Sequence, residues 1–216
     1  MFKFIVVGDS SVGKSCLLRR FETGEFAAVT AATVGLEYIS KRFNIDGHAV
    51  QLQVWDTAGQ ESLFSIVSSY FRSACGVLLV FDVTRRATFA HLERWFAQVE
   101  ELAHPTARLL LLGNKGDLAA QREVAAAEAE ALARQRGCAY LETSAKDGRN
   151  VREAFLRMAQ DVFVGLRQGS LRASEDGLGG IKRGELPSSW DREAVEQTPS
   201  ARLVPGPAAK RRSCCE

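Results

Sequence analysis

The sequence predicts an α/β fold, with a six-stranded, mostly parallel sheet, one antiparallel edge strand, and helices on both faces. Short apolar runs, often β-branched, alternate along the chain with segments of helical periodicity. This alternation is typical of a parallel sheet that is covered on both sides. In addition, two segments of alternating apolar and polar residues flank an Asp-Gly pair, which indicates a hairpin and therefore the one antiparallel strand.

The elements are expected in the order in which these patterns occur. Strands are predicted at 4–7, 39–45, 49–55, 77–81, 109–112 and 139–141, and the first helix at about 14–22. Two later helices are predicted from apolar stripes that would face the core. The stripes are Phe89, Leu92, Phe96 and Val99 in one helix, and Val151, Phe155, Met158 and Val162 in the last.

The helical and strand patterns stop near Gln168, which predicts a folded domain at 1–167 and a flexible tail at 168–216. The tail holds four of the five prolines and six of the eighteen glycines. A segment of this composition buries too little apolar surface to offset the entropy of ordering.

Composition and the N-terminal segment narrow the class of protein. A net charge of +2 argues against a nucleic-acid partner that is bound by bulk charge. Cys16, Cys75 and Cys138 fall in apolar segments and are expected to be free thiols, as in a reducing compartment. The N-terminus reads as a strand rather than a signal peptide, and no apolar run approaches the ~18 residues of a membrane span.

The stretch "GDSSVGKS", Gly8 to Ser15, matches the pattern G-x-x-x-x-G-K-[ST] between a predicted strand and a predicted helix. Its two glycines allow a tight turn in which backbone N–H groups face phosphate oxygens. Lys14 would bridge the β- and γ-phosphates, and the Ser15 hydroxyl would ligate Mg²⁺. The motif indicates a nucleotide phosphate site, but kinases, ATPases and GTPases all carry it.

The stretch "GNKGD", Gly113 to Asp117, directly follows the strand at 109–112. It therefore lies at a carboxyl end, where ligands bind in open α/β sheets. The Asp117 carboxylate could accept both N–H groups of the Watson–Crick edge of guanine, a donor pair that adenine lacks. Taken alone, the loop is also a common polar turn.

Two further stretches decide between these interpretations. "WDTAGQE", Trp55 to Glu61, ends the third strand, and its Asp56 could hold Mg²⁺ through water. "ETSAK", Glu142 to Lys146, ends the last strand. With these four stretches and "ATVGLEY", which contains Thr33, all five nucleotide motifs occur in order along the chain. Residues 2 to about 167 therefore resemble the Ras-like small GTPases, which implies the G domain of a P-loop GTPase.

The resemblance implies a role for individual residues. Gln60 would orient the attacking water and is the expected catalytic residue. Mg²⁺ would be held by Ser15, Thr33 and Asp56. The expected contacts to GTP or GDP are Ser10, Ser11, Val12, Gly13, Lys14, Ser15, Cys16, Phe26, Thr33, Gly59, Asn114, Lys115, Asp117, Ser144, Ala145 and Lys146.

The implied reaction is hydrolysis of GTP to GDP and phosphate, by in-line transfer of the phosphoryl group to water. No arginine in the motifs is placed to act as a finger from within the chain. Hydrolysis is therefore expected to be slow without an activating protein, whose arginine would contribute on the order of 10³–10⁵ in rate.

Within this superfamily the chain resembles the Rab family most, through "VGLEY", "QLQVWDTAGQE", "SYFRSA" and "LVFDVT". Tyr38, Trp55 and Tyr70 match the aromatic triad that Rab proteins present to effectors, although ordinary sheet packing would also explain them. The resemblance implies a switch that regulates vesicle and membrane trafficking.

Four positions depart from the Rab pattern. Ser62, Phe64 and Ser68 replace arginines that are common after "GQE", and Thr30 replaces an aromatic residue. These changes leave the nucleotide contacts intact but alter the surface that partner proteins would recognise.

The C-terminal "SCCE" fits the double-cysteine ending of Rab proteins and not a C-a-a-X box. Geranylgeranyl groups on Cys214 and Cys215 would anchor the protein stably, because one lipid chain binds a membrane only weakly and two give stable attachment. The basic run Lys210 to Arg212 would add attraction to anionic lipid.

The resemblance also implies partners and a location. The expected partners are an exchange factor, a GTPase-activating protein, prenylation and escort proteins, a GDP-dissociation inhibitor and trafficking effectors. The expected location is the cytoplasmic face of intracellular membranes, with a cytosolic pool.

Two other functions stay open at this point. One is a nucleotide-locked membrane scaffold with negligible hydrolysis. The altered segment with Ser62, Phe64 and Ser68 favours this function, and Gln60 and Thr33 argue against it. The other is a P-loop kinase, for which the chain offers no domain or lid that would bind an acceptor substrate.

Overall fold

The computed structural model describes residues 1–26, 36–57, 70–174, 177–182 and 196–197. The strands are β1 (Phe2–Val7), β2 (Leu36–Ile45), β3 (His48–Thr57), β4 (Gly76–Asp82), β5 (Arg108–Asn114), β6 (Ala139–Glu142) and β7 (Glu196–Gln197). The helices are α1 (Lys14–Thr23), α3 (Arg86–Ala90), α4 (Leu92–Leu102), α5 (Ala126–Gln135) and α6 (Val151–Arg167), with short 3₁₀ turns η2 (Ala119–Gln121) and η3 (Leu178–Gly180). None of the helices in these ranges combines the length and apolar character that a bilayer-spanning segment needs.

The strands form one sheet in the order β6-β5-β4-β1-β3-β2, with the two-residue β7 added beyond β2. β1 lies in the middle and pairs in parallel with both β3 and β4, and β5 and β6 continue the parallel part. Among the strands that the structure describes, only β2 and β3 pair antiparallel. The prediction of a mostly parallel sheet with one antiparallel pair is confirmed.

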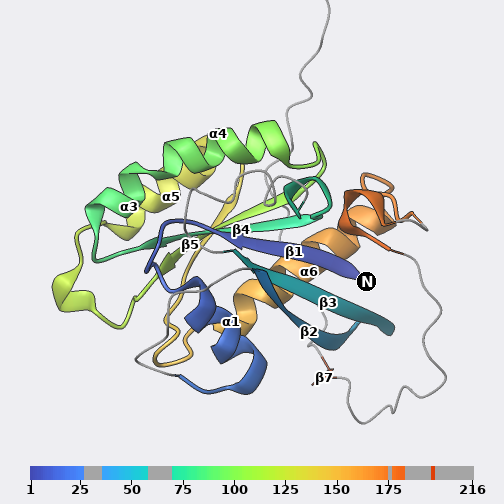
Figure 1. Cartoon of the computed structure of the whole chain (residues 1–216), viewed down its shortest axis with the longest axis horizontal. Coiled ribbons are helices and arrows are strands. Elements are labelled where there is room, and N and C mark those ends of the chain that lie inside the picture. Colours follow the sequence, from blue (N-terminus) through green and yellow to red (C-terminus); the bar gives the residue numbers. More distant parts are fainter. Residues whose placement is uncertain (27–35, 58–69, 175–176, 183–195, 198–216) are drawn as a thin grey trace, which may run out of the picture.

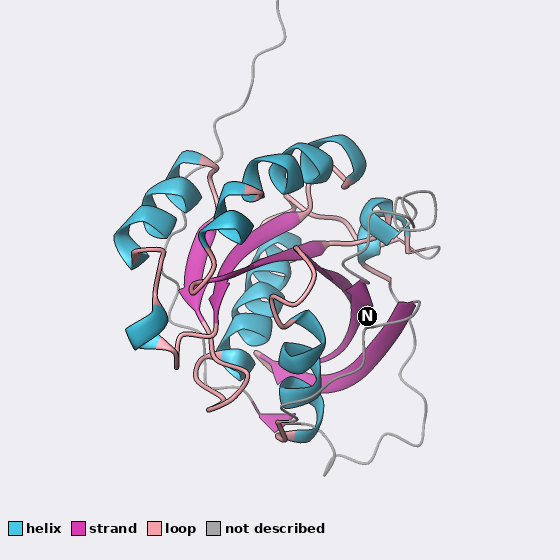
Figure 2. Ribbon diagram, turned by 60° about the vertical axis from the view of Figure 1, so that its left-hand side comes forward, coloured by secondary structure: helices cyan, strands magenta, loops and turns pink. Residues whose placement is uncertain are grey.

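Helices cover both faces of the sheet (Figures 1 and 2). On β1, Phe4 and Val6 face α1 and α6, whereas Ile5 and Val7 face the layer of α4 and α5. Successive strand residues point to opposite faces, so a strand covered on both sides must be apolar throughout. This explains why β4 is buried at all seven positions.

The hairpin between β2 and β3 forms at the predicted Asp-Gly pair. Ile45 pairs with His48, and Asp46 and Gly47 between them have φ of 49° and 80°. Two adjacent residues with positive φ are what a tight hairpin turn requires. The Gly47 N–H also donates to the Asn44 Oδ1 atom at 2.8 Å.

The single helix predicted from the stripe that starts at Phe89 is divided in two. His91 separates α3 from α4 and has φ −72° and ψ −8°, a tighter turn than an α-helix. The stripe itself is confirmed, because Leu92 and Phe96 are buried in the core and Phe89 and Val99 are partly buried against the same core cluster.

The predicted start of the flexible tail at Gln168 needs correction. Residues 168–174 and 177–182 pack against the domain at the amino end of β1. Leu171 is 4% exposed and Ile181 is 2% exposed. Ile181 forms a β-bridge with Phe2, and the Lys182 N–H donates to the Met1 carbonyl at 3.0 Å.

This packed segment lacks a local pattern that could have predicted it. Two apolar side chains supply its buried surface, and a glycine supplies its close approach. A Cβ at Gly180, whose φ is +77°, would lie 2.3 Å from the Cys75 backbone nitrogen, so a larger residue does not fit. Tertiary contacts therefore order a stretch whose composition alone indicates a linker.

We expect Leu171→Ala to lower the free energy of unfolding by roughly 2–5 kcal/mol, because it leaves a cavity at a buried site. Urea unfolding of the full chain at one fixed, saturating GDP concentration would measure the loss. Arg172→Ala, at the exposed neighbouring position, is the matched control and should change stability by less than about 0.5 kcal/mol. Equal stability of Leu171→Ala and the wild type would contradict the packing described here.

Candidate functional site: the loops at the carboxyl ends of the strands

The sequence motifs meet at one edge of the sheet. β1, β3, β4, β5 and β6 run in the same direction, so their carboxyl ends lie along this edge (Figure 1). The chain continues from β1 towards β3 through α1, and returns to β4 on the other side of β1. The loop after β1 therefore lies at the position where open α/β sheets bind ligands.

The loop after β1 has a backbone that depends on its two motif glycines. Gly8 has φ +141°, and a Cβ there would lie 2.1 Å from the Val80 carbonyl oxygen. Gly13 has φ +97°, and its Cβ would lie 2.5 Å from the Asn114 Nδ2 atom. Gly13 also precedes α1, and among the described residues no side chain caps that helix. The helix start is thus suited to an anionic ligand.

Lys14 lies with its side chain folded back over this loop. Its ammonium donates to the backbone carbonyls of Gly8 and Asp9, both at 2.8 Å, and the residue is 6% exposed. Burial lowers the pKa of Lys14 to about 8, although the negative charges of Asp56 and Asp9 favour the charged form. An ammonium with so little solvation is well placed to bind a phosphate group.

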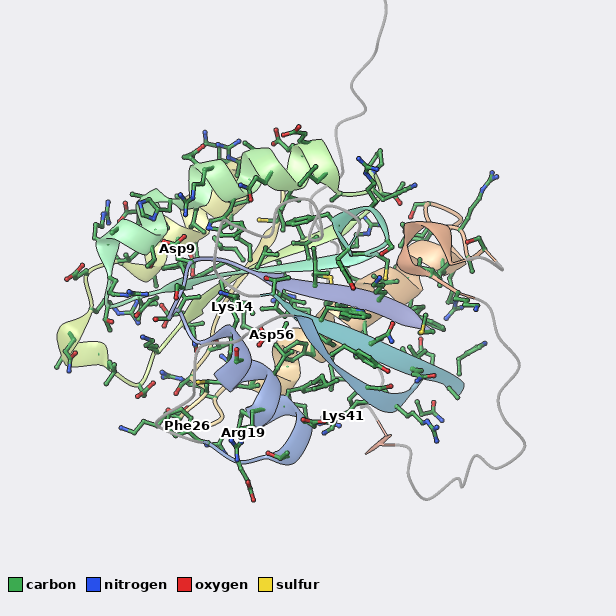
Figure 3. The ribbon with its side chains drawn as sticks, in the orientation of Figure 1. Asp9, Lys14, Arg19, Phe26, Lys41 and Asp56 are labelled. Atoms are coloured by element: carbon green, nitrogen blue, oxygen red, sulfur yellow. The ribbon has the colours of Figure 1, made fainter. Side chains whose placement is uncertain are left out.

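Ser15 and Asp56 supply oxygen atoms that fit a magnesium ion. The Ser15 hydroxyl donates to the Asp56 Oδ2 atom, and Asp56 is 3% exposed at the end of β3. In Figure 3, Asp56 lies next to Lys14 and the start of α1. Hydroxyl and carboxylate oxygens are the ligands that Mg²⁺ prefers, and the ion would neutralise phosphate charge when bound.

Asn114 joins three loops through its side-chain amide. The residue is 1% exposed, its Nδ2 atom donates to the Val12 carbonyl at 2.8 Å, and its Oδ1 atom accepts from the Thr143 hydroxyl at 3.2 Å. The loops after β1, β5 and β6 are therefore held in one arrangement.

Asp117, the predicted base-reading residue, is oriented by the loop after β6. The Ser144 hydroxyl donates to the Asp117 Oδ1 atom at 2.7 Å, and Ser144 is fully buried. The Gly116 N–H donates to the Thr143 carbonyl at 3.0 Å. These contacts fix the carboxylate in one orientation, as a bidentate contact to a base edge requires.

Arg20 of α1 positions Ala145 and Lys146, a role that the motifs did not predict. Its Nε atom donates to the Ala145 carbonyl at 2.7 Å, and its Nη2 atom donates to the Lys146 carbonyl. Arg20 follows the phosphate motif by one and a half helical turns, but no local pattern links it to a loop 125 residues away.

Asp82 is a second contributor that sequence reasoning missed. It is fully buried at the end of β4, and the Lys115 ammonium lies 2.7 Å from its Oδ2 atom. Burial would raise the pKa of Asp82, but hydrogen bonds from Lys115 and Thr84 outweigh it and hold the pKa below the usual value. The available signal was an aspartate directly after an apolar strand in "LVFDVT".

The structure describes some of the other predicted nucleotide contacts, and the rest lie outside the described residues. Ser10 and Ser11 are exposed on the loop, Cys16 is half-buried in α1, and Phe26 is 38% exposed beyond the end of α1. The remaining predicted contacts and the catalytic residue, Thr33, Gly59 and Gln60, lie outside the described residues.

The predicted aromatic triad is contiguous. Tyr38 pairs with Trp55 across the hairpin, and their ring centroids lie 4.8 Å apart. The ring centroid of Tyr70 lies 4.6 Å from that of Trp55. Tyr38 is 53% exposed, so the triad reaches the surface. Lys3, which the sequence analysis did not single out, places its ammonium 5.0 and 4.8 Å from the Trp55 and Tyr70 rings.

Comparison with known proteins agrees with this geometry. The model of the Ras family matches residues 3–164, a range that runs from β1 into α6 and includes the loop after every parallel strand.

We expect Asp117→Asn to weaken GTP binding on the order of 10²-fold or more, because the carboxamide loses one acceptor for the guanine edge. Xanthine carries a carbonyl where guanine has its 2-amino group, so binding of xanthosine triphosphate should improve. Competition titrations with the two nucleotides would measure both effects. An unchanged GTP affinity would contradict the role given to Asp117.

Proposed function

The chain belongs to the Ras family of small GTPases, and on this premise we propose that it is a Rab-like switch that regulates vesicle and membrane trafficking. Proteins of this family bind GTP and GDP with Mg²⁺ and change their partners with the nucleotide. The observation that carries the Rab-like assignment is the contiguous triad of Tyr38, Trp55 and Tyr70. A partly exposed aromatic cluster is the kind of surface that binds a protein partner.

The nucleotide site proposed for this switch uses the loops described above. Lys14 would contact the phosphates, Asn114 would support the base loop, and Asp117 would read guanine. Gln60 is proposed to orient water for hydrolysis, and Thr33 to provide a second hydroxyl for Mg²⁺ beside Ser15. Catalysis in such a site rests on positioning and on charge stabilisation rather than on covalent chemistry.

A nucleotide-locked scaffold is the second candidate. The substitutions Ser62, Phe64 and Ser68 after the "GQE" motif favour it, because they change the segment next to the proposed catalytic residue. Single-turnover assays with GTP and ATP side by side separate the candidates. Hydrolysis of GTP alone supports the switch, and tight binding of GTP without turnover supports the scaffold.

The kinase alternative loses its basis, because the family match covers residues 3–164, which include all the loops of the nucleotide site.

We expect Gln60→Leu to keep its affinity for GTP while hydrolysing it at least roughly tenfold more slowly, which corresponds to about 1.4 kcal/mol of activation free energy. The side chain is proposed to position water and not to hold the nucleotide. Single-turnover hydrolysis with stoichiometric GTP would measure the rate. Identical rates in the variant and the wild type would support the scaffold instead.

The membrane part of the proposal rests on the C-terminal cysteines. We propose that Cys214 and Cys215 carry geranylgeranyl groups, that Lys210 to Arg212 strengthen the attachment, and that the protein cycles between intracellular membranes and cytosol. Prenylation and escort proteins, a GDP-dissociation inhibitor, an exchange factor and an activating protein would then be its regulators. These residues lie outside the described part of the chain, and the support is their sequence alone.

We expect the double variant Cys214→Ser/Cys215→Ser to be cytosolic and each single variant to bind membranes weakly, because one lipid chain gives only reversible attachment. Fractionation of cells that express each variant, together with the intact mass of the wild-type C-terminal peptide, is the measurement. Replacing Ser213 by Ala is a control that leaves both thiols in place. A wild-type peptide without prenyl mass would rule out the lipid anchor.

A further inference from the structure

Asp9 connects the phosphate loop to α4 through its carboxylate. The Trp95 indole N–H donates to the Asp9 Oδ1 atom at 2.8 Å, and the His91 Nδ1 atom lies 2.6 Å from the Oδ2 atom. The Arg94 guanidinium lies 3.3 Å from the Oδ1 atom. The Asp9 side chain is 13% exposed, so these contacts surround it on the side of α4.

The loop needs such restraint from outside, because its own backbone is unusual. Within six residues, Gly8, Ser11 and Gly13 all have positive φ. Ser11, with φ of 62°, is not a glycine, and L-residues with a side chain disfavour this conformation. A loop of this kind persists only where the surrounding structure fixes it.

A second contact from the same part of the fold holds the next residue. The Arg85 Nη2 atom donates to the Ser10 carbonyl at 3.0 Å, and its Nε atom donates to the Asp82 Oδ2 atom at 3.2 Å. Arg85 directly precedes α3. Consecutive loop residues are therefore held from the segment that runs from the end of β4 through α3 into α4.

The restraint also reaches the lysine that faces the phosphates. The Asp9 carbonyl accepts one of the two hydrogen bonds of the Lys14 ammonium. Figure 3 shows Asp9 on the α3 side of the loop and Lys14 on the side of α1. The side chain of Asp9 thus attaches the loop to α4, and its backbone carbonyl positions Lys14.

The charge state of Asp9 favours this arrangement. Burial alone would raise the pKa of Asp9, but hydrogen bonds from Trp95 and His91 and the positive charge of Arg94 hold it below the usual value. Hydrogen bonds to a charged acceptor are stronger than neutral ones, so the carboxylate is a firm attachment point.

We infer that Asp9 is a positioning residue whose attachment to Trp95, His91 and Arg94 lets α4 set the rate at which the phosphate loop releases nucleotide. The inference rests on nucleotide binding at this loop. His91 and Arg94 are about half exposed, so the outer side of the attachment is open to solvent. Release of nucleotide would then depend on a surface of α4 in addition to the loops that contact the nucleotide.

Dissociation of a fluorescent GDP analogue from the full chain with Mg²⁺ tests the inference. We expect Asp9→Ala to release GDP on the order of tenfold faster. Trp95→Phe, which loses one donor and keeps an aromatic ring, should accelerate release at least roughly twofold but less than Asp9→Ala does. Asp9→Asn keeps an acceptor oxygen for Trp95 and should fall between the wild type and Asp9→Ala. The double variant Asp9→Ala/Trp95→Phe should release GDP no faster than Asp9→Ala, because Asp9→Ala already removes the hydrogen bond that Trp95→Phe loses.

Glu128→Gln is the matched control. It weakens the ion pair of Arg86 with Glu128, which joins α3 to α5 and does not touch the loop. Its release rate should equal that of the wild type. An equal acceleration in Glu128→Gln, or effects of Asp9→Ala and Trp95→Phe that multiply, would overturn the inference.

A spectroscopic measurement separates failure of this inference from failure of the proposed function. With ¹⁵N-labelled tryptophan, the indole N–H resonance that Trp95→Phe removes is assigned to Trp95. It should shift in nucleotide-free Asp9→Ala and less in Asp9→Asn. A resonance that does not move would overturn the attachment, whereas a wild-type chain that binds no guanine nucleotide would overturn the proposed function and leave this test intact.

Discussion

The geometry of the site depends on the side-chain amide of Asn114. This buried amide donates to the loop after β1 and accepts from the loop after β6, while the residue itself ends β5, directly before the base loop. The same amide leaves no space for a side chain at Gly13, because a Cβ there would lie 2.5 Å from the amide nitrogen. The glycine of one motif is therefore required by the asparagine of another, and neither motif is complete alone. Removing one partner of such a network leaves the other polar groups buried and unpaired, which costs more than the hydrogen bond contributed.

A second link connects the same loops through charge. Asp82 holds Lys115 of the base loop with one oxygen, and that oxygen also accepts from Arg85, which reaches the Ser10 carbonyl of the phosphate loop. The two cations share one buried carboxylate, so each depends on the same group for its orientation. Together with Asn114, this link makes the phosphate half and the base half of the site parts of one network. A guanine nucleotide would thus meet a site whose two halves are already positioned relative to each other.

The sequence predicted most of what depends on local pattern. The strands, the Asp-Gly hairpin and the placement of "GNKGD" at a strand end follow from apolar periodicity and from turn residues, and the structure has them in place. What it could not predict depends on residues far apart in the chain. Arg20 and Asp82 act through loops more than thirty residues away, and Asp9 acts through α4, more than eighty residues further on. The packing of residues 168–174 and 177–182 could not be predicted for the same reason, since Leu171 and Ile181 have no periodic apolar neighbours.

The packed residues 168–174 and 177–182 lie at the opposite end of β1 from the phosphate loop. β1 has six residues and so spans roughly 20 Å. The phosphate loop follows its carboxyl end, while Ile181 pairs beside Phe2 at its amino end. β7 joins β2 at Phe43 and Asn44, next to the hairpin turn and at this same end. Residues 177–182 therefore lie at the end of the sheet opposite the nucleotide loops. A partner that binds at this end of the sheet would therefore leave the nucleotide loops open to a regulator.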